Sequence, residues 1–246
     1  MIVSSNEVQK DFQKYLSLAA KEDVIITRNG IEVARLLSME GKPDPIFQES
    51  TVRETAESYY FKGRKASYEE FLELTRDEES RYEYIDGEIF LLASPRTGHQ
   101  YAMTQLIGRF FNEFNGGTCT PFVAPYDIRL KRPYSDDPCI VQPDLMVICD
   151  LDDHLDERDY YSGVPALVVE ILSESTQNKD LVKKLDLYLE CGVKEYWIVA
   201  PADKKVILYE LQDQKISQTA IYKLGETAQS FLFEGLSVEL KQIFKE

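Results

Sequence analysis

Two carboxylates in the middle of the chain each stand alone in an otherwise apolar stretch. Asp144 lies in the run from Cys139 to Cys149, and Glu170 is the one charge in the run from Ala166 to Ser173. Such runs are typical of strands that are buried on both faces. A buried carboxylate is costly unless its charge is compensated, and one divalent cation shared by both residues would compensate the two together.

A cation held by these side chains would suit phosphoryl chemistry. Mg²⁺ takes one or two protein carboxylates, keeps waters for a substrate phosphate, and makes a bound water nucleophilic. A lysine would orient that water or stabilise developing charge. Lys184 follows on the next predicted helix, on one face with Asp180 and Tyr188. Two other interpretations stay open: a helix salt bridge between Asp180 and Lys184, and a pair of internally hydrogen-bonded carboxylates.

The apolar pattern also predicts the elements that position these residues. Strands over 139–149 and 166–173 are joined by an acidic loop over 150–163, and a helix over 180–190 follows. If the two strands are neighbours, both carboxylates can point at one spot. Two more strands are predicted at 195–200 and 205–211.

Upstream of this region, two accessory candidates sit on predicted elements. Ser67 and Glu70 form a capping-box pattern, and the stretch 81–92 reads as a hairpin that turns at Asp86-Gly87. Glu83 in that hairpin is a candidate metal or water ligand, or else an outward polar position. His99 opens an amphipathic helix that ends at Asn115-Gly116-Gly117, and it is a candidate phosphate contact or an ordinary helix-start histidine. Further strands are predicted at 118–123 and 126–130.

These motifs resemble a known family. Pro143-Asp144 followed by Glu170 looks like the PD-(D/E)XK nuclease signature, and the ordered set is similar to the Uma-type restriction endonuclease family: YEYIDGEIF, QPDLMVI, VVEILSEST and GVKEYWIVAP. The resemblance implies a restriction-endonuclease-like α/β (α+β) fold, a mixed sheet flanked by helices, and metal-dependent phosphodiester hydrolysis. It also implies Mg²⁺ or Mn²⁺ on Asp144, Glu170 and the carbonyl of Ile171. One departure is Leu172, which occupies the usual lysine position, so Lys184 becomes the candidate lysine.

Residues 1–42 read as a separate unit. A helix starting near Ser4 or Ser5 precedes a hairpin with its turn at Asn29-Gly30. Because one helix and one hairpin bury too little, the unit predicts a homodimer or docking onto another surface. It resembles the N-terminal half of Phd/YefM-type antitoxins, which implies dimerisation, DNA binding with Arg28 as a candidate contact, and a toxin-like partner. Residues 43–66 read as a linker, and 67–246 as the nuclease-like domain.

Composition limits the classes further. The formal net charge is −15, which argues against indiscriminate binding to nucleic acid or an anionic membrane. The four cysteines show no metal-finger spacing, and a reduced, cytoplasmic compartment is the simpler expectation. No stretch approaches a membrane span.

The sequence therefore predicts a metal-dependent endonuclease acting on DNA, fused to an antitoxin-like module. A second hypothesis is a non-catalytic DNA-binding or regulatory protein that keeps the nuclease scaffold. A third is a self-inhibiting pair, in which the first unit covers the cleft of the second.

Overall fold

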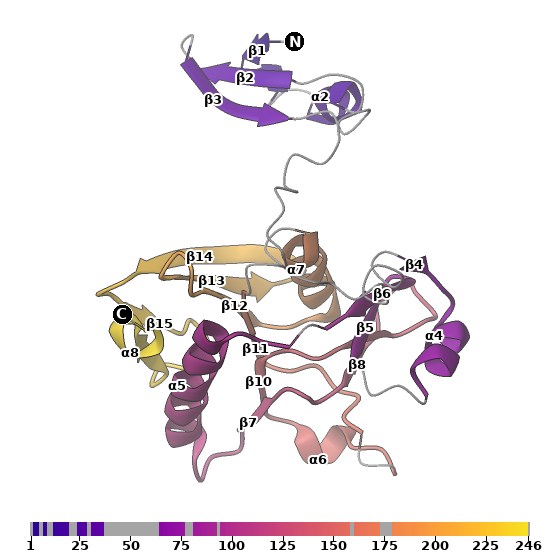
Figure 1. Ribbon diagram of the computed structural model, residues 1–246, viewed down its shortest axis with the longest axis vertical. Helices are drawn as coiled ribbons and strands as arrows, with labels where there is room; N and C mark the ends of the chain where they lie inside the picture. The colour runs from indigo at the N-terminus through magenta and orange to yellow at the C-terminus, as the bar shows by residue number, and fades with distance from the viewer. Residues whose placement is uncertain are drawn as a thin grey trace. The chain divides into compact units, whose positions relative to one another are not determined.

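The chain divides into two compact units, Met1–Arg53 and Glu54–Glu246 (Figure 1). The computed structural model describes residues 2–4, 7–8, 12–19, 24–28, 31–36, 64–76, 81–92, 94–157, 160–172 and 179–245. The division falls inside the stretch 43–66, for which the sequence predicts a linker.

The first unit is a three-stranded sheet with a helix. Its elements are β1 (Ile2–Ser4), α2 (Phe12–Ala19), β2 (Val24–Arg28) and β3 (Ile31–Leu36). The strand β2 pairs antiparallel with β3 and parallel with β1. A small core joins Val8 and Tyr15 to Val24 and Ile26. The sequence did not indicate the strand β1, and the side chains of Ser4 and Ser5, the predicted helix caps, lie outside the described residues.

A six-stranded mixed sheet is the centre of the second unit. Its order is β14-β13-β12-β11-β10-β7, with bounds β7 (Thr120–Val123), β10 (Leu145–Ile148), β11 (Leu167–Ile171), β12 (Glu195–Ala200), β13 (Lys205–Gln212) and β14 (Lys215–Lys223). The strands β11 and β12 are parallel, and the other neighbours are antiparallel. Every residue of β10, β11 and β12 is buried, so these strands carry apolar residues on both faces.

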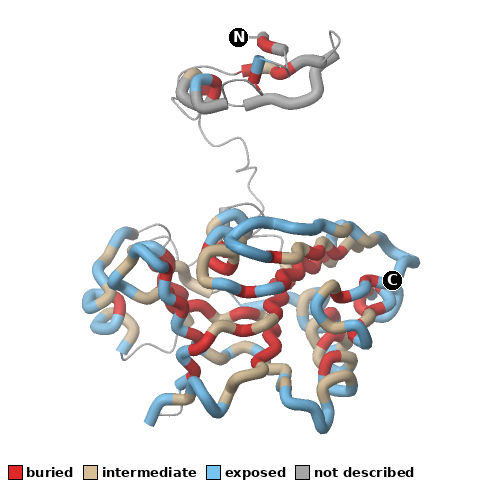
Figure 2. Tube along the Cα trace, turned by 180° about the vertical axis from the view of Figure 1, so that it is seen from behind, coloured by how far each residue is buried: buried red, intermediate tan, exposed pale blue. Residues whose placement is uncertain are grey.

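The two faces of this sheet pack against different elements. Leu145 and Val147 face a cluster with helix α5 (Thr97–Phe114) and the C-terminal elements β15 (Thr227–Gln229), β16 (Ser237–Glu239) and α8 (Leu240–Ile243). Met146 and Ile148 face helix α7 (Lys179–Cys191) and a second sheet. Figure 1 shows α5 and α7 on opposite sides of the sheet, and Figure 2 shows the buried strands running between them.

The second sheet has five strands in the order β4-β6-β5-β9-β8. They are β4 (Arg64–Lys65), β5 (Tyr82–Ile85), β6 (Glu88–Leu91), β8 (Ile128–Leu130) and β9 (Cys139–Val141). The predicted hairpin is confirmed: Asp86 and Gly87 both have positive φ, at 52° and 76°, as its tight turn requires. The capping box is also confirmed, because Ser67 and Glu70 hydrogen-bond each other's backbone at the start of α4 (Tyr68–Thr75).

The predicted strand over 139–149 is wrong as a single element. It is two strands, β9 in the five-stranded sheet and β10 in the six-stranded sheet, separated by Gln142, Pro143 and Asp144. Proline has no N–H to donate to a sheet ladder, so the chain leaves one sheet and enters the other at this point. Asp144 therefore lies at the junction of the two sheets, immediately before β10.

The structure also contains a disulfide that the sequence did not indicate. Cys119 and Cys149 form a disulfide across 30 positions of the sequence. Strand pairing explains this, because β7 and β10 pair Thr120 with Ile148, which brings the next residue of each strand face to face. Cys139 and Cys191 are free. The acidic loop contains one short helix, α6 (Leu151–His154). Within the described residues, no helix has the length and apolar character needed to cross a membrane.

Candidate active site

Asp144 and Glu170 come together because their strands are antiparallel neighbours. The pairing of Leu145 with Val169, continued by one step, sets Asp144 opposite Glu170. Residues directly opposite in an antiparallel pair share a face, with Cβ atoms about 5 Å apart. The backbone N–H of Ile171 donates to Asp144 Oδ2 at 2.7 Å, which fixes the aspartate against the end of β11. The predicted meeting of these two carboxylates is thus present in the structure.

Lys184 reaches this site from α7. Its Nζ donates to Glu170 Oε1 and to Glu83 Oε1, both at 2.9 Å. The Tyr188 hydroxyl, one helical turn further, donates to the same Glu170 oxygen at 2.7 Å. All four side chains are buried. The helix spacing that singled out Lys184 and Tyr188 therefore places both on Glu170, while the side chain of Asp180 lies outside the described residues.

Glu83 belongs to the same cluster. It lies in the middle of β5, is only 3% exposed, and accepts a hydrogen bond from the backbone N–H of Gln142 at 2.9 Å. The alternative of an outward polar position is wrong for this residue, because the second sheet turns β5 toward α7. A buried carboxylate in this position requires a cation, and Lys184 supplies it.

His99 lies on the third residue of α5 and contacts Asp144. Its Nε2 is 3.1 Å from Asp144 Oδ1 and 3.2 Å from Oδ2. Its Nδ1 is buried and has no hydrogen-bond partner among the described residues, and the same holds for Gln142 Oε1 and the Tyr196 hydroxyl. The rings of Tyr196 and Tyr188 lie 5.2 Å apart. These three buried polar atoms, which have no partner in the described part of the chain, lie on residues next to the cluster. Buried unsatisfied polar groups are uncommon in folded proteins, and a functional site is one reason for them.

The net effect of burial and the neighbouring charges is to shift the pKa values of Glu170 and Lys184 upward. Burial, with smaller contributions from the charges of Asp144 and Glu83, raises the pKa of Glu170 to about 7 against the lowering effects of the Lys184 charge and the Tyr188 hydrogen bond. Burial lowers the pKa of Lys184, but the carboxylates of Glu170 and Glu83 outweigh it and hold that pKa well above the ordinary value. Strongly shifted groups with named charge partners are typical of functional sites.

The donor set suits a hard cation. Asp144 and Glu170 offer carboxylate oxygens, and within the described residues the hydrogen bonds of Glu170 fall on Oε1, which leaves Oε2 for a ligand. The described residues contain no cluster of three or more His, Cys, Asp or Glu side chains of the kind that cages a metal. Two carboxylates with waters are what Mg²⁺ commonly uses, whereas a structural zinc site needs a closed set of four ligands.

Two residues near this site, Gln142 and Tyr196, were not predicted from the sequence, and the predicted role of Arg28 stays a prediction. Gln142 and Tyr196 carried no signal in the sequence beyond their neighbours Pro143 and Trp197. Arg28 ends β2 in the other unit, and its side chain lies outside the described residues.

Comparison with known proteins identifies a family and a related fold. The model of the Uma2 family, described as "Putative restriction endonuclease", matches residues 68–241. An uncharacterized protein of Synechocystis sp. is 28% identical over 150 residues, which are 61% of this chain and 76% of that protein. A crystal structure of a "putative nuclease belonging to DUF820" from Anabaena variabilis has a TM-score of 0.58 at 20% identity, over 72% of this chain and 96% of that one.

The structural match shows that the two chains share a fold, in which a mixed sheet and an antiparallel sheet are flanked by helices. The family match covers well over half of the chain and includes every residue of the cluster built around Glu170. This chain therefore belongs to the Uma2 family, a family of nuclease type.

Proposed function

We propose that this protein is a metal-dependent endonuclease that hydrolyses phosphodiester bonds of DNA with Mg²⁺ or Mn²⁺. The observation that supports this most is the 2.9 Å contact between Lys184 Nζ and Glu170 Oε1. The nuclease motif has its lysine two residues after the glutamate, where this chain has Leu172. A lysine that arrives from α7 restores the missing group at the same carboxylate.

Each residue of the cluster has a role that its contacts support. Asp144, Glu170 and the main-chain carbonyl of Ile171 would hold the cation, which when bound polarises a phosphoryl oxygen and makes water more acidic. The raised pKa of Lys184 keeps its amine protonated, so Lys184 orients the attacking water and stabilises negative charge instead of accepting a proton. His99 holds Asp144 in place.

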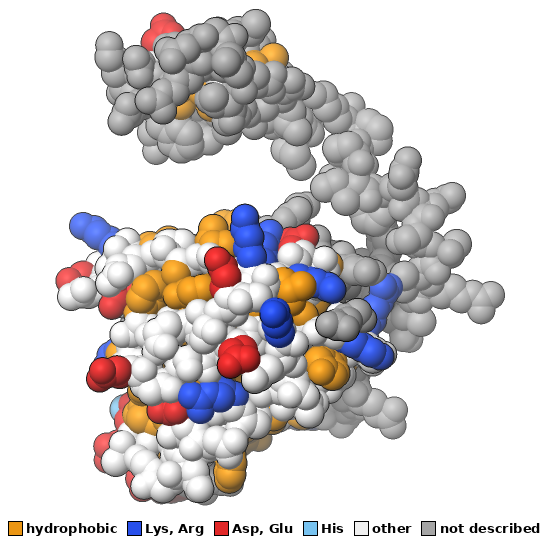
Figure 3. All heavy atoms as spheres, turned by 90° about the vertical axis from the view of Figure 1, so that its left-hand side faces the viewer, with side chains coloured by type: hydrophobic (Ala, Val, Ile, Leu, Met, Phe, Trp, Pro, Cys, Tyr) orange, Lys and Arg blue, Asp and Glu red, His pale blue; other side chains and the backbone are white. Residues whose placement is uncertain are grey.

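The first unit would supply dimerisation and DNA contacts. A dimer would let two sites act on two strands, and Arg28 remains the candidate contact in that unit. A toxin-like partner stays a prediction from the resemblance. The overall charge of the protein does not favour nonspecific binding to DNA. The formal net charge is −15, and Figure 3 shows acidic and basic side chains interspersed on one face. A local site that a cation makes attractive to phosphate is consistent with that balance.

The second candidate is a non-catalytic DNA-binding protein on the nuclease scaffold. Its supporting observation is that protein groups contact both carboxylates: Lys184 and Tyr188 hydrogen-bond Glu170, and His99 and the backbone of Ile171 contact Asp144. Catalysis requires divalent-cation binding at Asp144 and Glu170, whereas this candidate needs neither carboxylate.

Calorimetry with Mn²⁺ and Mg²⁺ distinguishes the two candidates. We expect the wild-type protein to bind the cation and the Asp144→Ala/Glu170→Ala variant to lose that binding, with cleavage of a DNA duplex lost in parallel. The matched control is Asp203→Ala/Glu210→Ala, which removes two carboxylates elsewhere and should bind as the wild type does. Titration is repeated with a DNA duplex present, because some sites fill only beside phosphate. Cleavage that survives loss of Asp144 would contradict the proposal.

A further inference from the structure

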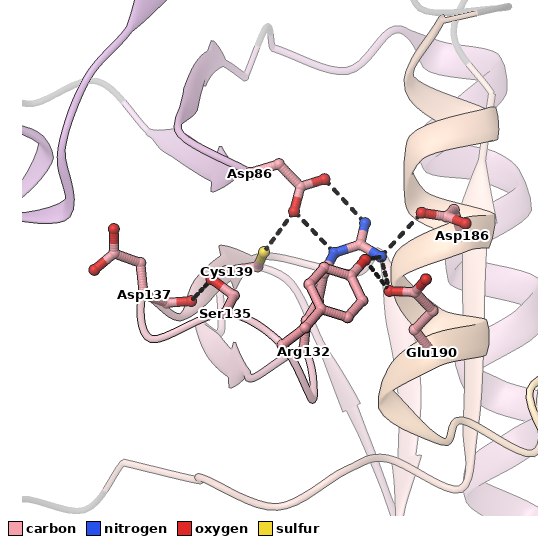
Figure 4. Close-up of polar contacts among 8 residues, drawn as sticks. Asp86, Arg132, Ser135, Asp137, Cys139, Asp186 and Glu190 are labelled. Atoms are coloured by element: carbon pink, nitrogen blue, oxygen red, sulfur yellow. Dashed lines mark hydrogen bonds and ion pairs between the residues drawn. The ribbon is translucent and has the colours of Figure 1, made fainter.

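A second buried charge lies outside the site, at Arg132, two residues beyond β8. Its side chain is only 2% exposed. Nε and Nη2 donate to Oδ1 and Oδ2 of Asp86 at 2.8 and 2.9 Å, which is a bidentate pair. Nη1 donates to Asp186 Oδ2 at 2.9 Å, to the Tyr134 hydroxyl at 3.2 Å, and to Glu190. Figure 4 shows the guanidinium between the carboxylate of Asp86 and the two carboxylates on the helix.

Arg132 has more acidic partners than charge neutralisation requires. Burial alone would lower its pKa, but the hydrogen bonds to Asp86 and Glu190 outweigh burial and raise it above the ordinary value. One carboxylate would compensate the charge, yet three are present. They come from two elements, since Asp86 is in the turn of the β5–β6 hairpin while Asp186 and Glu190 lie one helical turn apart on α7. The planar fork of an arginine holds Asp86 through two parallel hydrogen bonds while Nη1 contacts the helix, a fixed geometry that the single ammonium group of a lysine does not provide.

The two elements that Arg132 joins are the ones that carry Glu83 and Lys184. Glu83 lies three residues before Asp86, and Lys184 lies two residues before Asp186. The bond from Lys184 Nζ to Glu83 Oε1, at 2.9 Å, is therefore a second bridge across the same interface. Lys183 adds a third bridge, by its ion pair with Glu88 and its position 5.1 Å from the centre of the Phe90 ring.

The position of Lys184 depends on how α7 docks against the hairpin. A lysine has a flexible stem and a compact charge, so its own side chain does not define where Nζ lies. Nζ meets both Glu83 and Glu170 at 2.9 Å only while the helix keeps its distance from β5. A displacement of about 1 Å at a reacting group can cost about a hundredfold in rate.

We propose that Arg132 is a positioning residue, which clamps α7 to the β5–β6 hairpin through Asp86, Asp186 and Glu190 and thereby sets Lys184 against Glu170. The rate effect rests on the proposed nuclease function, whereas the placement of Lys184 does not. A merely structural anchor would lower stability but would leave Lys184 buried in the molecules that remain folded.

The test uses three variants of the full chain and one matched control. Arg132→Lys keeps the charge and removes the fork. Asp86→Asn weakens the hairpin end of the clamp, and Asp186→Asn/Glu190→Gln weakens the helix end. All three carboxylates are more exposed than Arg132, so these two variants decide the matter if Arg132→Lys does not fold. The control is Arg109→Lys, because Arg109 anchors α5 by donating to the carbonyls of Gly235 and Ser237, both at 2.7 Å.

Two readouts are taken below the unfolding transition: the rate of reductive methylation of Lys184 by mass spectrometry, with the half-exposed Lys205 as internal reference, and kcat and KM for DNA cleavage. We expect labelling of Lys184 to rise at least fivefold in the folded clamp variants, and kcat to fall about ten- to a hundredfold with KM nearly unchanged. Arg109→Lys should change neither.

Labelling of Lys184 that stays at the wild-type rate in the folded clamp variants would overturn the proposal. An equal rise in Arg109→Lys would overturn it as well, because the effect would then be general loosening. If the wild-type protein cleaves no DNA, the proposed function fails, and the labelling rates still decide whether Arg132 places Lys184.

Discussion

At the scale of single residues, the cluster depends on the charged amine of Lys184, which lies between the buried carboxylates of Glu83 and Glu170. Lys184 satisfies Glu83 and Glu170 together, and none of the three has more than slight exposure to water. Removing one partner of a buried ion pair leaves an uncompensated charge, which costs more than the pair gains. The same contacts that would serve catalysis therefore also contribute to stability, and stability measurements can test them without substrate.

We expect Lys184→Met to lower the free energy of unfolding by about 3–5 kcal/mol, because both carboxylates stay buried without a cation. Denaturant unfolding at pH 8 measures this loss. Glu83→Gln/Lys184→Met should recover part of it, since one charge is gone. The control Lys205→Met breaks an exposed pair with Asp203 and should cost at most about 1 kcal/mol. A Lys184→Met protein as stable as the control would contradict the geometry of the cluster.

The raised pKa of Glu170 predicts a pH dependence of stability. Because the folded-state pKa of about 7 lies above the usual glutamate pKa of 4.5, the folded protein binds the proton more tightly than the unfolded chain. Ionisation of Glu170 therefore lowers stability as the pH rises between these values, and the cost is complete above the folded-state pKa.

Urea unfolding of the metal-free protein from pH 5 to pH 8 tests this. Relative to Glu170→Gln, the wild type should lose roughly 2–3 kcal/mol across the range. Parallel stability curves for the two proteins would show that the pKa of Glu170 is not raised. The comparison removes the contributions of other titrating groups, which both proteins share.

At the scale of elements, the site lies where the two sheets meet α7, and His99 reaches Asp144 from α5. The chain crosses from β9 to β10 at Pro143, so Asp144 stands at the junction, while β5 and α7 bring Glu83 and Lys184 from either side. The edge strand β7 is joined to β10 by a disulfide immediately beyond the paired residues. This link closes a loop of the chain that contains β8 and β9.

We expect removal of the disulfide to lower the free energy of unfolding by about 2–4 kcal/mol, because Cys119 and Cys149 close a loop of 30 positions. The variant Cys119→Ser/Cys149→Ser, measured by denaturant unfolding, gives the size of the effect. Reducing agent should bring the wild type to the stability of this variant and leave the variant unchanged. Cys191→Ser is the control, because Cys191 is free. A wild type that reducing agent does not affect would contradict the disulfide.

At the scale of the whole molecule, the two units have separate cores. The clusters of the second unit contain only buried residues from Phe71 onward, and the cluster of the first unit ends at Ile26. Among the described residues, each hydrophobic cluster draws its members from one unit alone. The proposed division of labour, with dimerisation in the first unit and chemistry in the second, can therefore be tested by separation.

We expect a chain of residues 54–246 to unfold at the same denaturant concentration as the second unit of the full protein, because its cores are intact. Light scattering should show a dimer for the full chain and a monomer for the shortened one. A shortened chain that stays dimeric would contradict the role proposed for the first unit. DNA cleavage that increases on shortening would instead support self-inhibition.

Features that depend on neighbouring residues could be predicted from the sequence. The Ser67–Glu70 capping box, the Asp86-Gly87 turn, the buried strands around Val147 and Val169, and the face shared by Lys184 and Tyr188 all follow from local spacing and backbone preference. The motifs also identified the family, because the order of such elements along the chain is itself a pattern.

Contacts between residues that are distant in the sequence could not be predicted in this way. Lys184 bonds Glu83 across 101 positions of the sequence, Arg132 joins Asp86 to α7, and Cys119 reaches Cys149 through strand pairing. Local periodicity says that a strand exists and which residues share its face, but not which sheet the strand joins. That choice is made by the summed burial of both sheets and α7, so the break at Pro143 and the inward direction of Glu83 appear only in the folded chain.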